Sequence, residues 1–224
     1  MEKKYRSGES IYVREYKNVF DNELCDTLVS TYERLWKEQS ELLKKLSLCY
    51  TPSGVKTCGA CDCQRLDIMQ HKEFKEPFKL VIKGIQNTLT QYKEDVDMHH
   101  SQWPKKYSFE NLRIKRYLCD TNQQHDFHSD VGDKDSARRF FSIICYLNDE
   151  FDGGHTLFPM FDQEFKPSKG TILLFPCTWS YLHKGSECTN GYAKYMLGSF
   201  LQYDQRQEMN RIGDRTMGLD NTNI

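Results

Sequence analysis

The second half of this chain, from about residue 107, breaks into short apolar or alternating runs separated by Gly, Pro, Asn and Asp. These runs are LRIKRYLC, RRFFSIICYLN, HTLFP, QEFKP, GTILLFP, SYLHKG and YAKYMLGSFLQY. Runs this short, with regular turn-forming residues between them, are typical of β-strands in a sandwich or barrel. The pattern therefore predicts a mainly β core and excludes an all-helical fold.

The first hundred residues show helical periodicity instead. Asp21 is a plausible N-cap for a helix over residues 21–46, in which leucines recur at helical spacing. A second helix is predicted over 78–92, with Pro77 at a suitable start. Residues 51–70 are predicted to form a Gly- and Cys-bearing loop that leads into a strand. The fold class expected is α+β, mainly β, with N-terminal helices that support the β core.

Composition limits the classes of partner. The 224 residues are 38% hydrophobic, and 31 basic residues face 32 acidic ones, so charge favours neither nucleic acid nor an anionic membrane. No apolar run is long enough to span a bilayer, and the first residues lack the apolar region of a signal peptide. Nine cysteines without an export signal indicate reduced thiols. A cytoplasmic protein is expected, with its oligomeric state open.

One structural domain is expected, in three parts. Residues 1–106 hold the helices and a flap-like loop packed on the core, 107–205 form the core, and 206–224 form a loose polar tail.

The stretch QHDFHSDVG, residues 124–132, concentrates histidine and aspartate. On a strand, His128 and Asp130 leave the same face and can share one ion. His183, near the end of another predicted strand, is the best third ligand, and two imidazoles with one carboxylate form the facial triad of non-haem Fe(II) oxygenases. His125, three residues before His128, is expected to face the other way. Taken singly, each residue has a plainer interpretation: an H-x-D triplet arises often by chance, and a lone histidine is usually packed in a core.

A longer series of motifs surrounds these residues. Tyr117 precedes HSD, and then follow CYLND at 145–149, GGHTLF at 153–158, KPSKGTILLF at 166–175, LHKG at 182–185 and GYAK at 191–194. In order and spacing, residues 109–203 resemble the Fe(II)- and 2-oxoglutarate-dependent dioxygenases, particularly the prolyl 4-hydroxylase group. The resemblance implies a double-stranded β-helix, or jelly roll, with Fe(II) in its mouth.

The resemblance also implies roles for single residues. His128, Asp130 and His183 would bind the iron, and these three would be catalytic. Lys194, Tyr117 and Thr156 would hold 2-oxoglutarate, and Arg139 would lie near the substrate. One departure concerns Lys194, which follows His183 by eleven residues where the family has ten; a bulge near Tyr192 would absorb the extra residue.

The activity implied is hydroxylation of an unactivated C–H bond, coupled to decarboxylation of 2-oxoglutarate to succinate and CO2. Fe(II), 2-oxoglutarate and O2 are the expected cofactors, with ascorbate in support, and the expected partner is a protein or peptide substrate containing proline. A lysyl or free-amino-acid hydroxylase is the alternative, because TNGYAKYMLGSF also resembles the closing strand of lysyl hydroxylases. A non-catalytic jelly-roll binding module is the third hypothesis.

The segment CGACDC has two interpretations. Cys58, Cys61 and Cys63 with His71 could bind zinc, although their spacing is cramped. Alternatively, residues 51–64 could be a flap over the substrate, as the resemblance suggests, or a surface loop.

Overall fold

The computed structural model describes residues 8–45 and 63–203, and the side chains within these ranges except those of 39–45. Two α-helices and thirteen strands lie in this part of the chain, and every strand pair is antiparallel. The mainly β architecture with two helices that the sequence predicts is confirmed. Its predicted tail, its flap-like loop up to residue 62, and Cys58 and Cys61 fall outside the described residues.

The two predicted helices form close to their expected bounds. Helix α1 spans Asn22–Lys45, and the Asp21 carboxylate accepts a hydrogen bond of 2.7 Å from the backbone N–H of Leu24. Asp21 thus satisfies one of the free N–H groups at the helix start, as an N-cap does. Helix α2 spans Lys75–Asp95 and begins two residues before Pro77. Neither helix is both long and apolar enough to cross a membrane.

The larger sheet has seven strands. Its order is β1 (Arg14–Tyr16), β10 (Thr171–Pro176), β6 (Arg139–Tyr146), β13 (Ala193–Tyr203), β4 (Arg113–Leu118) and β2 (Gln64–Asp67), with β3 (Tyr107–Phe109) paired to β13. Strand β2 follows the Cys-bearing segment, as expected. Strand β1 was not predicted: it has three residues, too few to show a period.

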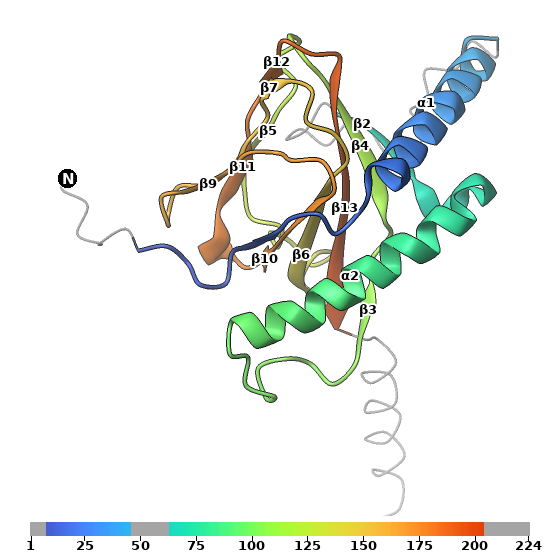
Figure 1. Cartoon of the computed structure of the whole chain (residues 1–224). Coiled ribbons are helices and arrows are strands. Elements are labelled where there is room, and N and C mark those ends of the chain that lie inside the picture. The colour runs from blue at the N-terminus through green and yellow to red at the C-terminus, as the bar shows by residue number, and fades with distance from the viewer. Residues whose placement is uncertain (1–7, 46–62, 204–224) are drawn as a thin grey trace, which may run out of the picture.

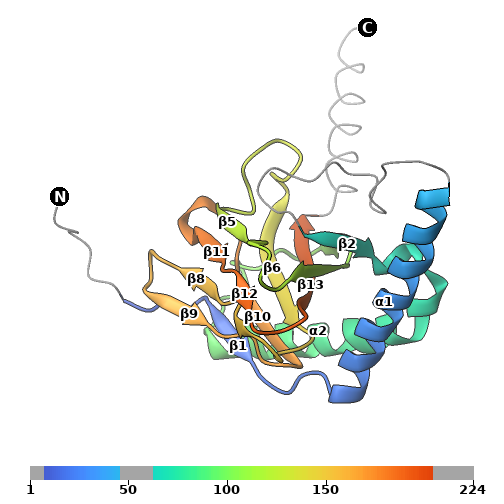
Figure 2. The same cartoon turned by 90° about the horizontal axis from the view of Figure 1, so that it is seen from above.

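A smaller sheet faces the larger one (Figures 1 and 2). It comprises β5 (His125–His128), β11 (His183–Gly185), β8 (Thr156–Phe158) and β9 (Gln163–Phe165). A separate ribbon pairs β7 (Asp152–Gly153) with β12 (Cys188–Thr189). Three short 3-10 turns complete the described elements, at Ile68–Gln70, Lys72–Phe74 and Trp179–Tyr181.

Helices α1 and α2 cover the outer face of the larger sheet, away from the smaller sheet (Figure 2). Tyr92 of α2 meets Phe141 of β6 edge-on with ring centroids 4.8 Å apart, and Tyr32 of α1 meets Tyr195 of β13 at 5.8 Å. Side chains alternate along each strand, so the opposite face of the same strands is free to line a pocket between the sheets. The helices therefore support the wall of that pocket.

Candidate active site

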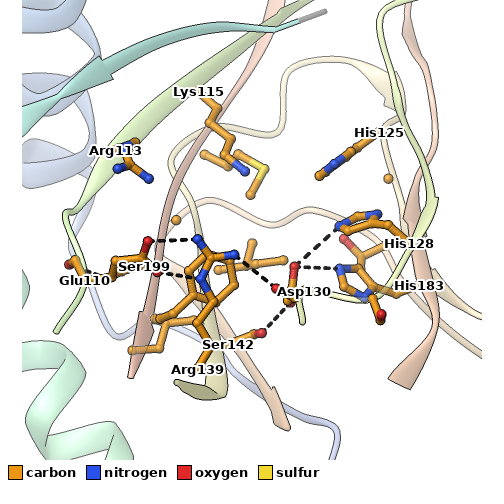
Figure 3. A pocket seen from close by; sticks show the side chains of 18 of the residues that line it. Glu110, Arg113, Lys115, His125, His128, Asp130, Arg139, Ser142, His183 and Ser199 are labelled. Carbon is orange, nitrogen blue, oxygen red and sulfur yellow. Dashed lines mark hydrogen bonds and ion pairs between the residues drawn. The ribbon is translucent and has the colours of Figure 1, made fainter. Parts of the chain in front are cut away.

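A pocket of about 550 Å³ opens between the two sheets. The predicted ligands His128, Asp130 and His183, the predicted cosubstrate residues Tyr117, Thr156 and Lys194, and Arg139 all line it. Figure 3 shows Asp130 pointing toward the two histidines, with the cationic side chains of β4 across the pocket. Seven residues that lie up to 77 positions apart thus share one cavity.

The three predicted metal ligands converge. The Nε2 atom of His128 lies 3.4 Å from Oδ1 of Asp130, and Nε2 of His183 lies 3.8 Å from the same oxygen. One donor atom from each residue lies within 4.8 Å of the others, and no other such cluster of His, Cys, Asp or Glu occurs among residues 8–38 and 63–203. Two ring nitrogens and one carboxylate oxygen make a facial donor set that leaves open positions and fits Fe(II).

The local backbone differs from the predicted strand in two ways. Strand β5 ends at His128, so Asp130 lies in the bend that follows and not on the strand. The prediction that His125 faces away is wrong, since the rings of His125 and His128 stack with centroids 3.6 Å apart. The cause is a register shift: His128 pairs with His183 and His125 with Gly185, so four residues of β5 lie opposite three of β11. Such a bulge turns two residues of odd spacing to one side.

Both histidines present Nε2 to the metal position because their Nδ1 atoms are engaged. Nδ1 of His128 contacts the carbonyl oxygen of Asp126 at 2.7 Å, and Nδ1 of His183 contacts that of Tyr181 at 3.0 Å. A carbonyl oxygen only accepts, so each Nδ1 carries the hydrogen and each Nε2 keeps its lone pair. Burial lowers the pKa of His183, which favours the neutral, ligating form.

The Asp130 carboxylate is fixed in its ionised form. Burial by itself raises the pKa of Asp130, but the neighbouring His128 and His183 side chains and the hydrogen bond from Ser142 outweigh burial, and the pKa falls below its usual range. The Ser142 hydroxyl donates to Oδ2 at 2.5 Å, and the Arg139 guanidinium donates to the backbone oxygen of Asp130 at 3.0 Å. Ser142 and Arg139 thus orient a carboxylate that is ready to bind a cation.

Lys194 lies on the opposite side of the pocket, on β13. Its side chain is buried, its ammonium donates a hydrogen bond to the carbonyl oxygen of Gly154, and the Tyr117 and Tyr146 rings lie 5.8 and 5.5 Å from it. Burial lowers the pKa of Lys194 to about 8. In the described part of the chain no carboxylate lies within ion-pair distance of this ammonium, so it has room for an anion.

Gly154 makes this position of Lys194 possible. Its φ is +67°, and a Cβ there would come within 2.8 Å of the Phe151 ring and 3.1 Å of Cδ of Lys194. A larger residue would therefore displace the lysine as well as strain the backbone. No register shift interrupts β13 between Ala193 and Gly198 where it pairs with β4. The ladder with β4 begins at Ala193, so Tyr192 lies in the bend before β13, where it is exposed, and a bulge near Tyr192 stays a prediction.

The neighbours of Lys194 include one residue to which sequence reasoning gave no role. The hydroxyl groups of Tyr146 and Thr156 lie 2.7 Å apart, and both residues are buried. Tyr146 stands in the motif CYLND, and its place on the same face of β6 as Ser142 was the available signal. Tyr117 is directly opposite Lys194 in the ladder between β4 and β13. Two tyrosine rings thus flank the buried ammonium, and one of them is hydrogen-bonded to Thr156.

Arg139 is already paired within the protein. Its guanidinium donates to both Glu110 oxygens, at 2.6 and 2.8 Å, and lies 4.0 Å from the Phe200 ring centroid. It lines the pocket, but its charge is balanced by Glu110. A contact between Arg139 and substrate stays a prediction.

The predicted zinc site stays a prediction as well. Within the residues described, neither Cys63 nor His71 belongs to a group of potential metal ligands.

Comparisons with known proteins agree with this geometry. Residues 112–202 match the family described as the 2OG-Fe(II) oxygenase superfamily. The "Putative prolyl 4-hydroxylase" of Acanthamoeba polyphaga mimivirus is 35% identical over 98 residues, which are 37% of this chain and 40% of that protein. The chain thus spans well under half the length of this curated relative.

Solved structures share the fold. The viral collagen prolyl hydroxylase of Paramecium bursaria chlorella virus 1, in its 2-oxoglutarate complex, superposes with a TM-score of 0.61 at 19% identity, over 86% of this chain and 97% of that one. A prolyl hydroxylase of Trichoplax adhaerens, in complex with a peptide fragment of the hypoxia-inducible factor oxygen degradation domain, gives 0.63 at 13% identity, over 86% and 84%.

The matched residues 112–202 include the His–Asp–His triad, whose donor atoms could hold a metal ion. Over residues 112–202 the chain resembles the 2OG-Fe(II) oxygenase superfamily, and over 98 residues it is similar to a putative prolyl 4-hydroxylase.

Proposed function

We propose that this protein is an Fe(II)- and 2-oxoglutarate-dependent dioxygenase that hydroxylates proline in a peptide. The observation that carries the proposal is the convergence of His128, Asp130 and His183 on one wall of a pocket whose opposite side holds the buried Lys194. In this proposal the two facing sheets are the double-stranded β-helix, and residues 107–205 form its catalytic part.

The charges of the site balance once the cofactors are bound. Fe²⁺ and Lys194 together bring three positive charges, whereas Asp130 and the 2-oxoglutarate dianion bring three negative ones. A buried charge is tolerated when it is paired and hydrogen-bonded, and Lys194 by itself is not paired with a carboxylate. Lys194 would therefore bind the far carboxylate of 2-oxoglutarate, with Tyr117 and Thr156 as hydroxyl donors beside it.

When bound, the iron with 2-oxoglutarate and O2 supplies the oxidant for an unactivated C–H bond, while 2-oxoglutarate leaves as succinate and CO2. The chain's own residues bind and orient. His128 and His183 keep Nε2 unprotonated through their Nδ1 hydrogen bonds, and Ser142 holds the Asp130 carboxylate in place. The Phe158 and Phe175 rings pack against His183 with centroids 5.5 and 4.8 Å from its own, which keeps water from that side of the site.

Peptidyl proline is the proposed target because the relatives are named as prolyl hydroxylases and one of them holds a peptide. Ascorbate would maintain the ferrous state. Lysine in a peptide is the competing target, since the closing strand also resembles that of lysyl hydroxylases.

The test is a substrate screen by mass spectrometry with Fe(II), ascorbate and 2-oxoglutarate, together with a succinate assay. A gain of one oxygen on proline, absent with the His128→Ala variant, supports the proposal. Oxygen on lysine, or succinate release that no peptide stimulates, contradicts the proline assignment. Failure of the wild type to bind 2-oxoglutarate in the presence of metal contradicts the oxygenase itself.

A further inference from the structure

The pocket carries a group of cations that the reaction does not use. Arg113 and Lys115 are two residues apart on β4, so both side chains leave the same face of the strand as Tyr117. Arg65 of β2 lines the same pocket and is directly opposite Lys115 in the ladder between β2 and β4. Two like charges directly opposite each other destabilise a sheet. We call Arg65, Arg113 and Lys115 the cationic wall.

The cationic wall has no carboxylate partner among residues 8–38 and 63–203. Arg113 is opposite Asp67 in the ladder between β2 and β4, but the two side chains form no ion pair. The Asp67 carboxylate instead accepts hydrogen bonds from the backbone N–H of Met69 and from the side chains of Gln70 and Asn111. All three cations are half-buried. Figure 3 shows Arg113 and Lys115 without the interactions that join Arg139 to Glu110.

The wider lining does not neutralise the wall. Glu110 is paired with Arg139, and Asp130 belongs to the metal site. Two further carboxylates line the pocket, Asp133 and Asp135, on the loop after the triad. The Asp133 side chain is occupied, because it accepts from the backbone N–H and the hydroxyl of Ser136 at 2.8 and 2.7 Å. The chain as a whole has a net charge of −1, so three cations in one cavity with no ion-pair partner in the described ranges are not a consequence of a basic composition.

The positive charge of the cationic wall also affects another ionisable side chain that lines the pocket. Lys115 contributes to lowering the pKa of Lys194, after the larger effect of burial. An anion bound between Lys115 and Arg65 would relieve this repulsion. 2-Oxoglutarate does not meet that need, because Lys194 is the buried cation beside Tyr117 and Thr156, whereas the cationic wall lies further along β4 and on β2.

We propose that the cationic wall binds acidic side chains of the substrate, so that this enzyme selects peptides in which aspartate or glutamate lies close to the target residue. This inference rests on the proposed function, because it takes the bound peptide to be the substrate of the enzyme. The positive charge of the cationic wall, unpaired within the described chain, is an observation of the structure. Cations within a concave pocket suit carboxylate side chains, whose charge would complement each of them, and charge complementarity of this kind determines specificity more than it adds affinity.

The test compares three fluorescein-labelled peptides with one central proline, flanked on both sides by Asp, by Asn or by Lys. Their binding to the full chain, loaded with Mn²⁺ and 2-oxoglutarate under nitrogen, is measured by fluorescence anisotropy. We expect the Asp peptide to bind about 10- to 100-fold more tightly than the Asn peptide, and this ratio to shrink as salt is added. The Lys peptide should bind most weakly.

The variants identify the residues responsible. The triple substitution Arg65→Gln, Arg113→Gln and Lys115→Gln should reduce the affinity of the Asp peptide relative to the Asn peptide to a ratio of about two or less. Lys106→Gln removes one charge from an exposed position outside the pocket and should leave the ratio unchanged. Unchanged melting temperatures and 2-oxoglutarate affinity show that the triple variant still folds. Should it fail to fold, Lys115→Gln alone is used, with about a threefold smaller ratio expected.

The outcomes separate this inference from the proposed function. Equal binding of the Asp and Asn peptides to the wild type, or a ratio that survives the triple substitution, overturns the cationic wall as a specificity element. Incubation of the same peptides with Fe(II) and O2, read by mass spectrometry, tests the function independently. Hydroxylated proline with no preference for the Asp peptide supports the proposed function and overturns this inference. Tighter binding of the Asp peptide without hydroxylated proline supports this inference and contradicts the proposed function.

Discussion

The two faces of strand β4 differ in whether their cationic side chains are paired with carboxylates. On the helix-covered face, Arg116 is buried, donates to both oxygens of Glu33 at 2.6 and 2.8 Å and to the Gln64 side chain at 2.6 Å, and packs near the Trp36 ring. On the pocket face, Arg113 and Lys115 have no such partners within the described chain.

This difference separates structural charge from functional charge. A charge that holds an element in place is paired by the protein itself, as Glu33 pairs Arg116 between α1 and β4. A charge that waits for a ligand is left unpaired, and its repulsion is relieved only on binding. Lys194 belongs with the second group, because its buried ammonium has no carboxylate within ion-pair distance in the described part of the chain.

The largest expected effect is at the metal site. Asp130→Ala should reduce metal binding and succinate formation below detection while the circular dichroism spectrum stays the same, because Asp130 lies on the pocket side and does not contact the helices. Anaerobic calorimetric titration with Fe(II) or Mn(II) measures the binding. His125→Ala is the matched control and should retain the metal, since His125 stacks on His128 without joining the donor cluster. Loss of metal in this control would make His125 a ligand.

Replacing Lys194 should strongly weaken the binding of 2-oxoglutarate and should not impair folding. Lys194→Met is expected to weaken 2-oxoglutarate binding by roughly 10²–10³-fold, because a dianion would then be buried unpaired. The melting temperature of the ligand-free variant should equal or exceed that of the wild type, since a buried charge without a counterion is removed. Calorimetry with the Mn²⁺-loaded protein and differential scanning calorimetry measure the two quantities. A near-normal affinity would assign the anion to another cation of the pocket.

On the opposite face of the sheet, the expected effect is on stability. Glu33→Gln should lower the free energy of unfolding by about 3 kcal/mol, because Arg116 would remain buried without its carboxylate. Urea denaturation measures this change, and 2-oxoglutarate affinity should stay the same. Glu38→Gln breaks only the exposed pair with Arg34, and a change under about 0.5 kcal/mol is expected. If Glu33→Gln weakened ligand binding without changing stability, the division between the two faces would be wrong.

The smallest expected effect is a pH dependence. The pKa of Lys194 is lowered to about 8 in the absence of ligand, so the ammonium that pairs with 2-oxoglutarate is lost as pH rises through this value. The dissociation constant should be flat below pH 7 and then increase by up to about tenfold per pH unit above 8, with proton uptake on binding. Isothermal titration in buffers of different ionisation enthalpy measures both. A Lys194→Arg variant, which stays charged, should bind more weakly but without this pH dependence.

Local patterns predicted both helices and most of the longer strands, and the resemblance to a family supplied the candidate site residues. Asp21 indicated the start of α1, because an N-cap acts over three residues. Alternation in LRIKRYLC indicated β4 and which of its residues share a face. The triad was identified from HSD and LHKG through their resemblance to a family, and the structure brings those three residues together.

The error at His125 has an identifiable cause. His125 was expected to face away because its spacing from His128 is odd, and a register shift against β11 reversed that expectation. Such a shift depends on how two strands align, which neither strand's own sequence reveals.

The sequence by itself determined the types of element, the faces of each strand, the donor chemistry of the triad and the lysine that follows it. These properties depend on residues a few positions apart, where periodicity and capping act. Tertiary structure decided which side chains meet: Arg65 opposite Lys115, Glu33 on Arg116, Glu110 on Arg139, and Thr156 with Tyr146 beneath Lys194. The physical reason is that pairing of charges and hydroxyls depends on long-range register and packing, so only the folded chain shows which charges remain unpaired.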